Sequence, residues 1–191
     1  MAKNKRNHQD NTADKLSKAQ LEHFWELEQK DLLAGNAPHF KFENGSIKLV
    51  DARPYYKDGK IIIPEPFDYI GSNAFIRINA PIKTLVLPKT LEKFKSFRGR
   101  IGVYELVLSE GIKSFRLDIL NSFYELYKVV LPKSLEHIDA ENWSPRRFCT
   151  FCVQKGSYAE AFVRDSGLTY EIAEQTQRKK CQRINFGTKD H

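Results

Sequence analysis

A short hydrophobic pattern recurs through the central part of the chain at intervals of 21 to 23 residues. Each copy has an apolar residue, two variable residues, an apolar residue, one variable residue and a final apolar residue. The alternation over its last three positions is typical of a β-strand with one buried face. The copies occupy residues 82–87, 103–108, 126–131 and 148–153, and a shorter version occupies 61–63.

A second pair of apolar residues follows each strand segment, after a Pro or a Ser. A single short strand with its return segment cannot bury its own apolar side, so neighbouring copies should stack and share one core. Self-similarity at about 20–29 residues is the signature of leucine-rich repeats. The apolar pairs are Phe67 with Ile70, Leu91 with Phe94, Ile112 with Phe115 and Leu135 with Ile138.

The segment that precedes the repeats predicts first a helix and then two hairpins. Residues 1–11 are polar and predict a disordered basic tail. Residues 12–35 have a broad apolar face and end at Gly35, which predicts an amphipathic helix. That face should pack on the open end of the domain, on a partner or on a second copy.

Residues 36–60 change to alternating patterns around two turn signals, Asn44-Gly45 and Asp58-Gly59. Both central positions of a type I′ turn need a positive φ angle, and these dipeptides tolerate it. The region therefore predicts a β-hairpin entrance to the repeats, with the second hairpin ending in the apolar run 61–63.

The repeats resemble those of the BspA-like leucine-rich repeat family, whose unit reads approximately L-x-x-I-x-I-P-x-x-V-x-x-I-G-x-x-A-F. Residues 61–75 match that unit through Pro64, Gly71 and the final Ala74-Phe75. Residues 153–170 look like the family's closing unit, a helix and a last strand, with Ser157 suited to the N-cap and Gly167 to the C′ position. The resemblance covers about residues 58–172 and implies a binding scaffold without catalytic activity.

The charge distribution separates the ends of the chain from its body. The net charge is +7, but residues 1–18 and 172–191 each hold five basic and two acidic side chains, so the body is nearly neutral. Basic ends either keep the protein in solution or attract a polyanion such as nucleic acid. In the predicted basic tail, 173–191, the candidate polyanion-binding residues are Arg178, Lys179, Lys180 and Arg183.

Composition favours a cytoplasmic protein without catalytic, cofactor or metal sites. There is no secretory signal, and no stretch approaches the roughly 18 apolar residues of a membrane-spanning helix. Three Cys are too few for a disulfide scaffold. Cys149 and Cys152 form a C-x-x-C pair, but a strand context argues against a redox or zinc motif. The five His have no spacing that indicates a base beside a nucleophile.

The most informative candidate site lies on the outward positions of the strands. The position between the last two apolar residues is aliphatic in most copies and Cys152 in the last, where an exposed sheet face usually carries polar residues. This column is explained by a protein partner, by a cover formed by the helix 12–35, or by β-propensity alone. We assign the partner-binding face to Ile62, Val86, Tyr104, Glu105, Val107, Tyr127, Lys128 and Val130, and expect Thr84, Thr150, Lys83 and Cys149 to face outward beside them.

The sequence thus predicts a mainly β fold, a short leucine-rich-repeat solenoid at 61–172 with an N-terminal helix, hairpins and a C-terminal helix-strand cap. Its predicted function is a non-enzymatic protein–protein interaction module. The alternative is a nucleic-acid or ribosome-associated protein held by its basic ends.

Overall fold

The structure is a computed structural model, and it describes residues 39–43, 46–65, 67–91, 93–94, 101–145 and 149–173. It also describes three isolated positions, Glu22, Glu26 and Lys30, which are helical and exposed. Their spacing of four residues is that of one polar face of a helix. The rest of the predicted helix 12–35, the predicted tail 1–11 and residues 174–191 lie outside the described residues.

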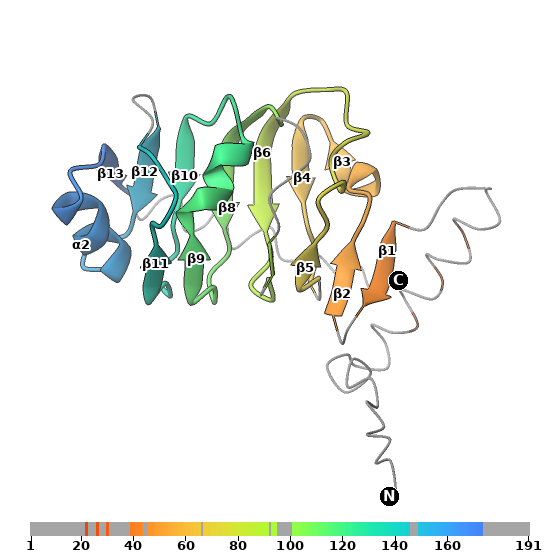
Figure 1. Ribbon diagram of the computed structural model, residues 1–191, viewed down its shortest axis with the longest axis horizontal. Coiled ribbons are helices and arrows are strands. Elements are labelled where there is room, and N and C mark those ends of the chain that lie inside the picture. The colour runs from red at the N-terminus through yellow and green to blue at the C-terminus, as the bar shows by residue number, and fades with distance from the viewer. Residues whose placement is uncertain are drawn as a thin grey trace, which may run out of the picture.

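The described part of the chain is mainly β, as the sequence predicts. Its largest sheet has seven strands in the order β13-β12-β10-β8-β6-β4-β3, which run side by side along the molecule (Figure 1). All neighbours are parallel except β3 and β4. The strands are β3 (Tyr56–Lys57), β4 (Lys60–Ile62), β6 (Ile82–Leu87), β8 (Val103–Leu108), β10 (Lys128–Val130), β12 (Thr150–Val153) and β13 (Tyr170–Ile172).

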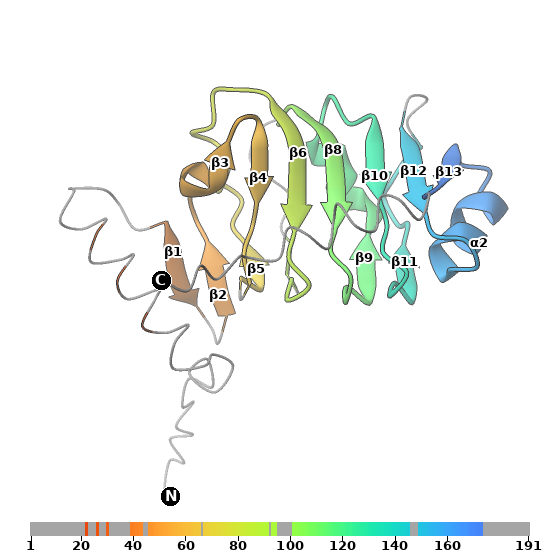
Figure 2. The same ribbon diagram turned by 180° about the vertical axis from the view of Figure 1, so that it is seen from behind.

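The first hairpin and the segments that connect the strands of the large sheet form two smaller sheets. One has the order β1-β2-β5-β7 and the other pairs β9 with β11. The views from opposite sides place the large sheet in one layer and the smaller sheets in the other (Figures 1 and 2). The elements are β1 (Phe40–Glu43), β2 (Ser46–Leu49), β5 (Tyr69–Ile70), β7 (Lys93–Phe94), β9 (Ser114–Arg116), β11 (His137–Asp139) and a 3-10 helix, η3 (Leu117–Ser122), between β9 and β10.

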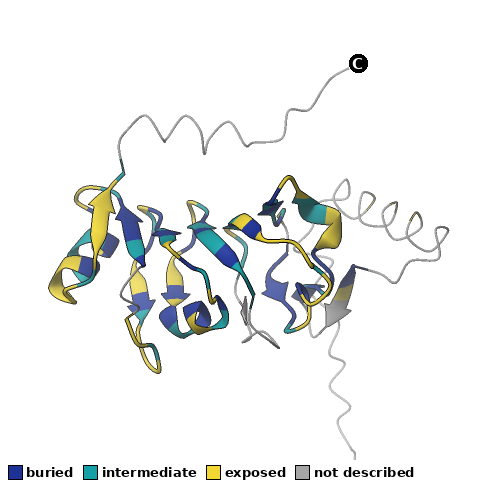
Figure 3. Cartoon of the chain, turned by 90° about the horizontal axis from the view of Figure 1, so that it is seen from above, coloured by how far each residue is buried: buried dark blue, intermediate teal, exposed yellow. Residues whose placement is uncertain are grey.

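The hydrophobic core lies between the two layers. The central apolar residues of the large sheet, Leu85, Leu106 and Val129, are fully buried, and they belong to the same core cluster as Phe115 and Ile138 from the return strands. Seen from above, buried segments occur in both rows (Figure 3). The apolar residues of the repeat strands therefore cover one side of the core, and the apolar pairs that follow those strands cover the other side.

Both predicted hairpins form. Strands β1 and β2 are antiparallel, and so are β3 and β4. Asp58 and Gly59 have φ angles of 53° and 82°, the left-handed conformation that a two-residue turn requires. Tyr55 is not in the second hairpin, because residues Arg53–Tyr55 form a 3-10 turn, η2, with a proline in its first positions.

The C-terminal end is closed by helix α2 (Tyr158–Asp165) and strand β13. Ser157 is the N-cap, and its hydroxyl accepts a hydrogen bond from the Glu160 amide. At the other end Gly167 has a φ angle of 65°, and the amide of Leu168 donates to the carbonyl of Val163. This is the Schellman arrangement that commonly ends a helix. The helix-strand unit predicted from the sequence is therefore present.

Candidate functional site

A column of aliphatic residues crosses the outer face of the large sheet. Ile62 pairs with Val86, Val86 with Val107, and Val107 with Val130, so the four residues lie at one height on four neighbouring strands. Each side chain is half-buried. Parallel register places these side chains next to one another across the strands. We call this set the aliphatic column.

A polar row runs beside the aliphatic column, two residues earlier in each strand. Thr84 pairs with Glu105 and Glu105 with Lys128. The Thr84 hydroxyl donates a hydrogen bond of 3.1 Å to the Glu105 carboxylate. The face therefore combines an aliphatic line with groups that can donate and accept hydrogen bonds.

Tyrosines lie at the amino-terminal ends of β8 and β10. The rings of Tyr104 and Tyr127 have centroids 6.0 Å apart, at an interplanar angle of 39°. Tyr127 is 56% exposed and Tyr124 is 47% exposed. The charge of Glu125 is the main cause that raises the pKa of Tyr104, followed by burial and by a hydrogen bond to the same carboxylate.

Sequence reasoning found Tyr104 and Tyr127 but missed Tyr124 and Glu125. The two missed residues precede β10, outside the strand pattern on which the outward face was assigned. The concentration of tyrosines at 124 and 127, one repeat after Tyr104, is the signal that could have indicated them.

The expectation that Cys149 faces outward is wrong, because it is buried in the core. Cys152 pairs with Val130 and so continues the outward column, but its side chain is covered and buried. Lys128 on β10 and Glu171 on β13 form an ion pair of 2.6 Å, and β12 lies between these two strands. The two long side chains thus meet over the short side chain of Cys152 and close the aliphatic column after Val130. Cys149 precedes the first residue of β12, where regular alternation of faces does not apply, and it joins the core.

The buried thiols are poorly suited to chemistry. Burial is the main cause that raises the pKa of Cys152 to about 11, so the neutral thiol prevails near neutral pH. Cys149 and Cys152 are both free of disulfides. Among the described residues no three His, Cys, Asp or Glu side chains are grouped so that they could hold a metal ion.

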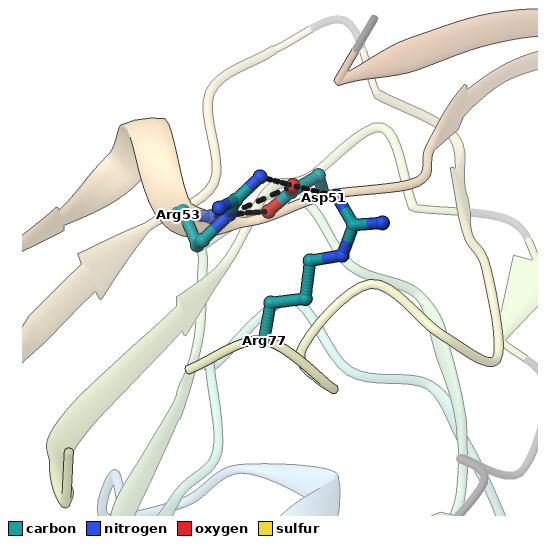
Figure 4. Close-up of polar contacts among 3 residues, drawn as sticks. All are labelled: Asp51, Arg53 and Arg77. Atoms are coloured by element: carbon teal, nitrogen blue, oxygen red, sulfur yellow. Dashed lines mark hydrogen bonds and ion pairs between the residues drawn. The ribbon is translucent and has the colours of Figure 1, made fainter. Parts of the chain in front are cut away.

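A buried carboxylate is the strongest electrostatic feature outside this face. Asp51 accepts hydrogen bonds from the Arg53 amide at 3.0 Å and from the Arg53 guanidinium at 2.6 to 3.1 Å. Arg77 approaches the same carboxylate to 3.9 Å (Figure 4). Burial alone would raise the pKa of Asp51, but the hydrogen bonds and charge of Arg53, with the charge of Arg77, outweigh it and hold that pKa below its ordinary value.

This ion cluster joins two segments that no pattern in the sequence connects. Asp51 follows β2, Arg77 lies in the turn after β5, and the Ala52 amide donates to the Ala74 carbonyl at 2.7 Å. The cluster ties the entrance of the fold to its first repeat. Its role is structural, since both oxygens of the carboxylate already accept hydrogen bonds from Arg53 within the fold.

The eight residues assigned to the partner-binding face all lie on β4, β6, β8 and β10 or next to β10. The structure brings Ile62, Val86, Val107 and Val130 into one line, and places Tyr104 beside Tyr127 and Glu105 beside Lys128. The candidate polyanion-binding residues, Arg178, Lys179, Lys180 and Arg183, lie outside the described residues.

No described helix is long and apolar enough to cross a membrane. The chain matches no family model, no curated protein and no solved structure. Its function must therefore be argued from its own geometry.

Proposed function

We propose that the chain folds as a short leucine-rich-repeat solenoid of the BspA-like kind. Five successive parallel strands in register support this proposal, since each follows its neighbour by one sequence repeat. The short strands β5, β7, β9 and β11, which form at the second pair of apolar residues of each repeat, support it further. So does the closing unit of one helix and one strand. In such a fold each repeat contacts mainly its neighbours and presents its strand to a continuous outer face.

We propose that this outer face binds a protein partner and that the protein is not an enzyme. The observation that carries the proposal is the aliphatic column: four half-buried aliphatic side chains at one height on adjacent strands. Contiguous apolar surface rimmed by polar groups is characteristic of interaction sites. The polar row on one side and the tyrosines at the strand ends provide such a rim.

The tyrosines favour a partner over intrinsic strand preference as the explanation. Valine and isoleucine are good strand residues wherever they occur, so β-propensity alone could produce the column. β-propensity does not explain why Tyr124 and Tyr127 are both about half exposed at the same end of the sheet. Tyrosine is among the residues that are enriched at protein interfaces and in their binding hot spots.

The proposed setting is a reducing compartment such as the cytoplasm. Neither Cys149 nor Cys152 is in a disulfide, and burial keeps Cys152 protonated. Such thiols persist where disulfides are not formed.

The test is a double substitution in the middle of the column, Val107→Lys with Val130→Lys, followed by affinity capture from the native host. The two residues are directly paired, so the change puts two charges at the centre of the face. We expect partner recovery to fall at least tenfold. The matched control is Ser114→Lys with His137→Lys, which adds two lysines at directly paired, exposed positions on β9 and β11 of the other layer.

Thermal unfolding of both double variants should show a folded protein. If the column variant is folded and still captures the same protein as the wild type, the column is not the binding site. Recovery of nucleic acid alone by the wild type would contradict the proposed function as a whole.

A further inference from the structure

Four side chains gather at the amino-terminal ends of β8 and β10: Tyr104, Tyr124, Glu125 and Tyr127. We call them the tyrosine–glutamate cluster. Tyr104 and Tyr127 are neighbours on adjacent strands, with ring centroids 6.0 Å apart. The pKa of Tyr104 is raised chiefly by the charge of Glu125 and to a smaller extent by Tyr127 and Tyr124, so each of these three groups lies near the Tyr104 hydroxyl.

Gly102 provides the space in which two of these groups converge. A Cβ atom on Gly102 would lie 2.8 Å from the Tyr124 hydroxyl and 2.9 Å from a carboxylate oxygen of Glu125. Real Cβ atoms do not approach other atoms so closely, so a side chain at this position would push aside the ends of the Tyr124 and Glu125 side chains. The backbone of Gly102 is not in the left-handed region. The absence of a side chain at Gly102 therefore leaves room for this arrangement of Tyr124 and Glu125.

The Glu125 carboxylate has no cationic partner among the described residues. It raises the pKa of Tyr104 by its charge and by a hydrogen bond, which is the effect of an ionised carboxylate on a phenol. The carboxylate is thus a negative charge bordered by three electron-rich rings, at least two of them about half exposed to solvent. A carboxylate and aromatic faces attract the same type of ligand, a cation.

We propose that the tyrosine–glutamate cluster binds an arginine side chain of the protein partner. The inference rests on the proposed function and names the chemistry that the partner must present. A guanidinium is planar, so it can stack on an exposed tyrosine ring while its N–H groups donate to the carboxylate. A lysine ammonium offers a single point charge and cannot stack, so it is the weaker ligand.

The position of the cluster also fixes where the arginine lies in the partner. Tyr104 and Tyr127 precede the column residues Val107 and Val130 by three residues in their strands. At about 3.3 Å per residue, the cluster and the column are about 10 Å apart. A partner that covers both presents an arginine about 10 Å from an apolar group, a separation that one extended segment of four residues spans.

The test measures binding of Nα-acetyl-arginine amide to the full chain by two-dimensional NMR. The uncharged isostere Nα-acetyl-citrulline amide is the control ligand, and Nα-acetyl-lysine amide is the third probe. We expect saturable shifts at residues 102–104 and 124–127, with a dissociation constant in the millimolar range expected of a single side chain. The lysine probe should bind several-fold more weakly, and the citrulline probe should cause no saturable shift.

Two variants and a matched control test which groups are responsible. Glu125→Gln should weaken the arginine probe at least about fivefold. Gly102→Ala should weaken it similarly, because the new methyl group displaces the Tyr124 hydroxyl and the Glu125 carboxylate. Glu141→Gln alters the net charge by the same amount at an exposed turn after β11 and should leave binding unchanged.

Equal shifts from the arginine and citrulline probes would overturn the proposal, and so would unchanged arginine binding by Glu125→Gln. The affinity capture described above separates this failure from that of the proposed function. If Val107→Lys with Val130→Lys abolishes partner capture while Glu125→Gln retains it fully, the aliphatic column binds the partner and the arginine site does not exist.

Discussion

The Asp51 carboxylate illustrates how one buried charge is accommodated in this fold. Its pKa lies below the ordinary value of 3.8, so its ionised form favours the folded state. That contribution is present at pH values above 3.8, and it is lost as the pH falls through the lower pKa of the folded state. The neighbouring arginines stay charged throughout this range.

Asp51→Asn should lower the free energy of unfolding at pH 7 by about 1.5–3 kcal/mol, the range for hydrogen bonds to a charged group. Because the wild-type carboxylate is itself protonated in strong acid, the difference between the two proteins should shrink as the pH falls below 4. Urea denaturation at a series of pH values measures this. Asp165→Asn, at an exposed pair with Arg164, should change stability by less than about 0.5 kcal/mol at any pH. A loss at Asp51 that does not depend on pH would contradict the electrostatic explanation.

Cys152 should resist alkylation in the folded protein. With a pKa of about 11, about one thiol in a thousand is ionised at pH 8, and the side chain is also almost fully buried. Iodoacetamide at pH 8 should leave Cys149 and Cys152 unmodified over hours and should modify both once guanidinium chloride unfolds the chain. Mass spectrometry of the tryptic peptide 148–155 reads out both residues. Rapid modification of the native protein would show that these strand thiols are accessible.

At the scale of elements, the closing helix α2 depends on its caps because it has only eight residues. A helix of this length is unstable in isolation, and tertiary packing with terminal hydrogen bonds must hold it. Ala159 and Val163 pack into the core, while Ser157 satisfies an amide at the first turn.

Ser157→Ala should reduce the free energy of unfolding by about 1 kcal/mol, because the Glu160 amide loses its acceptor. Hydrogen exchange in residues 158–165 should accelerate more than in the central strands. Ser166→Ala, at the exposed C-terminal end of the same helix, should have an effect below about 0.5 kcal/mol. Equal effects of the two substitutions would show that the cap is not important.

At the scale of the molecule, stability is shared along the stack. Residues from both layers and from both ends belong to one hydrophobic cluster. Leu106 lies in β8, between β6 and β10, so its side chain is enclosed by the repeats on both sides.

Leu106→Ala should therefore cost about 2–5 kcal/mol, the range for a buried leucine whose cavity cannot collapse. The same change at Leu168, which is only partly buried beside β13, should cost much less. Denaturation by urea measures both, and hydrogen exchange should accelerate in β6 and β10 as well as in β8. If only β8 responded, the repeats would be less strongly coupled than nearest-neighbour stacking implies.

The sequence by itself determined the repeat strands, the hairpin at Asp58-Gly59 and the caps at Ser157 and Gly167. These features follow from local chemistry: period-two burial, positive φ angles and hydrogen bonds within a few residues. The register of the aliphatic column also followed, because its residues occupy the same position of the strand pattern in each repeat.

Tertiary structure alone decided which outward positions are exposed and which groups meet. Cys152 is buried because Lys128 and Glu171 join above it from the two strands that flank β12. Asp51 meets Arg77 across 26 residues, and Glu125 meets Tyr104 across 21. No period predicts such pairings, because long side chains reach across strands and loops by distances that depend on the packed backbone. The outer face with its aliphatic column could therefore be predicted from the sequence, whereas the ion pairs and hydrogen bonds of the charged side chains could not.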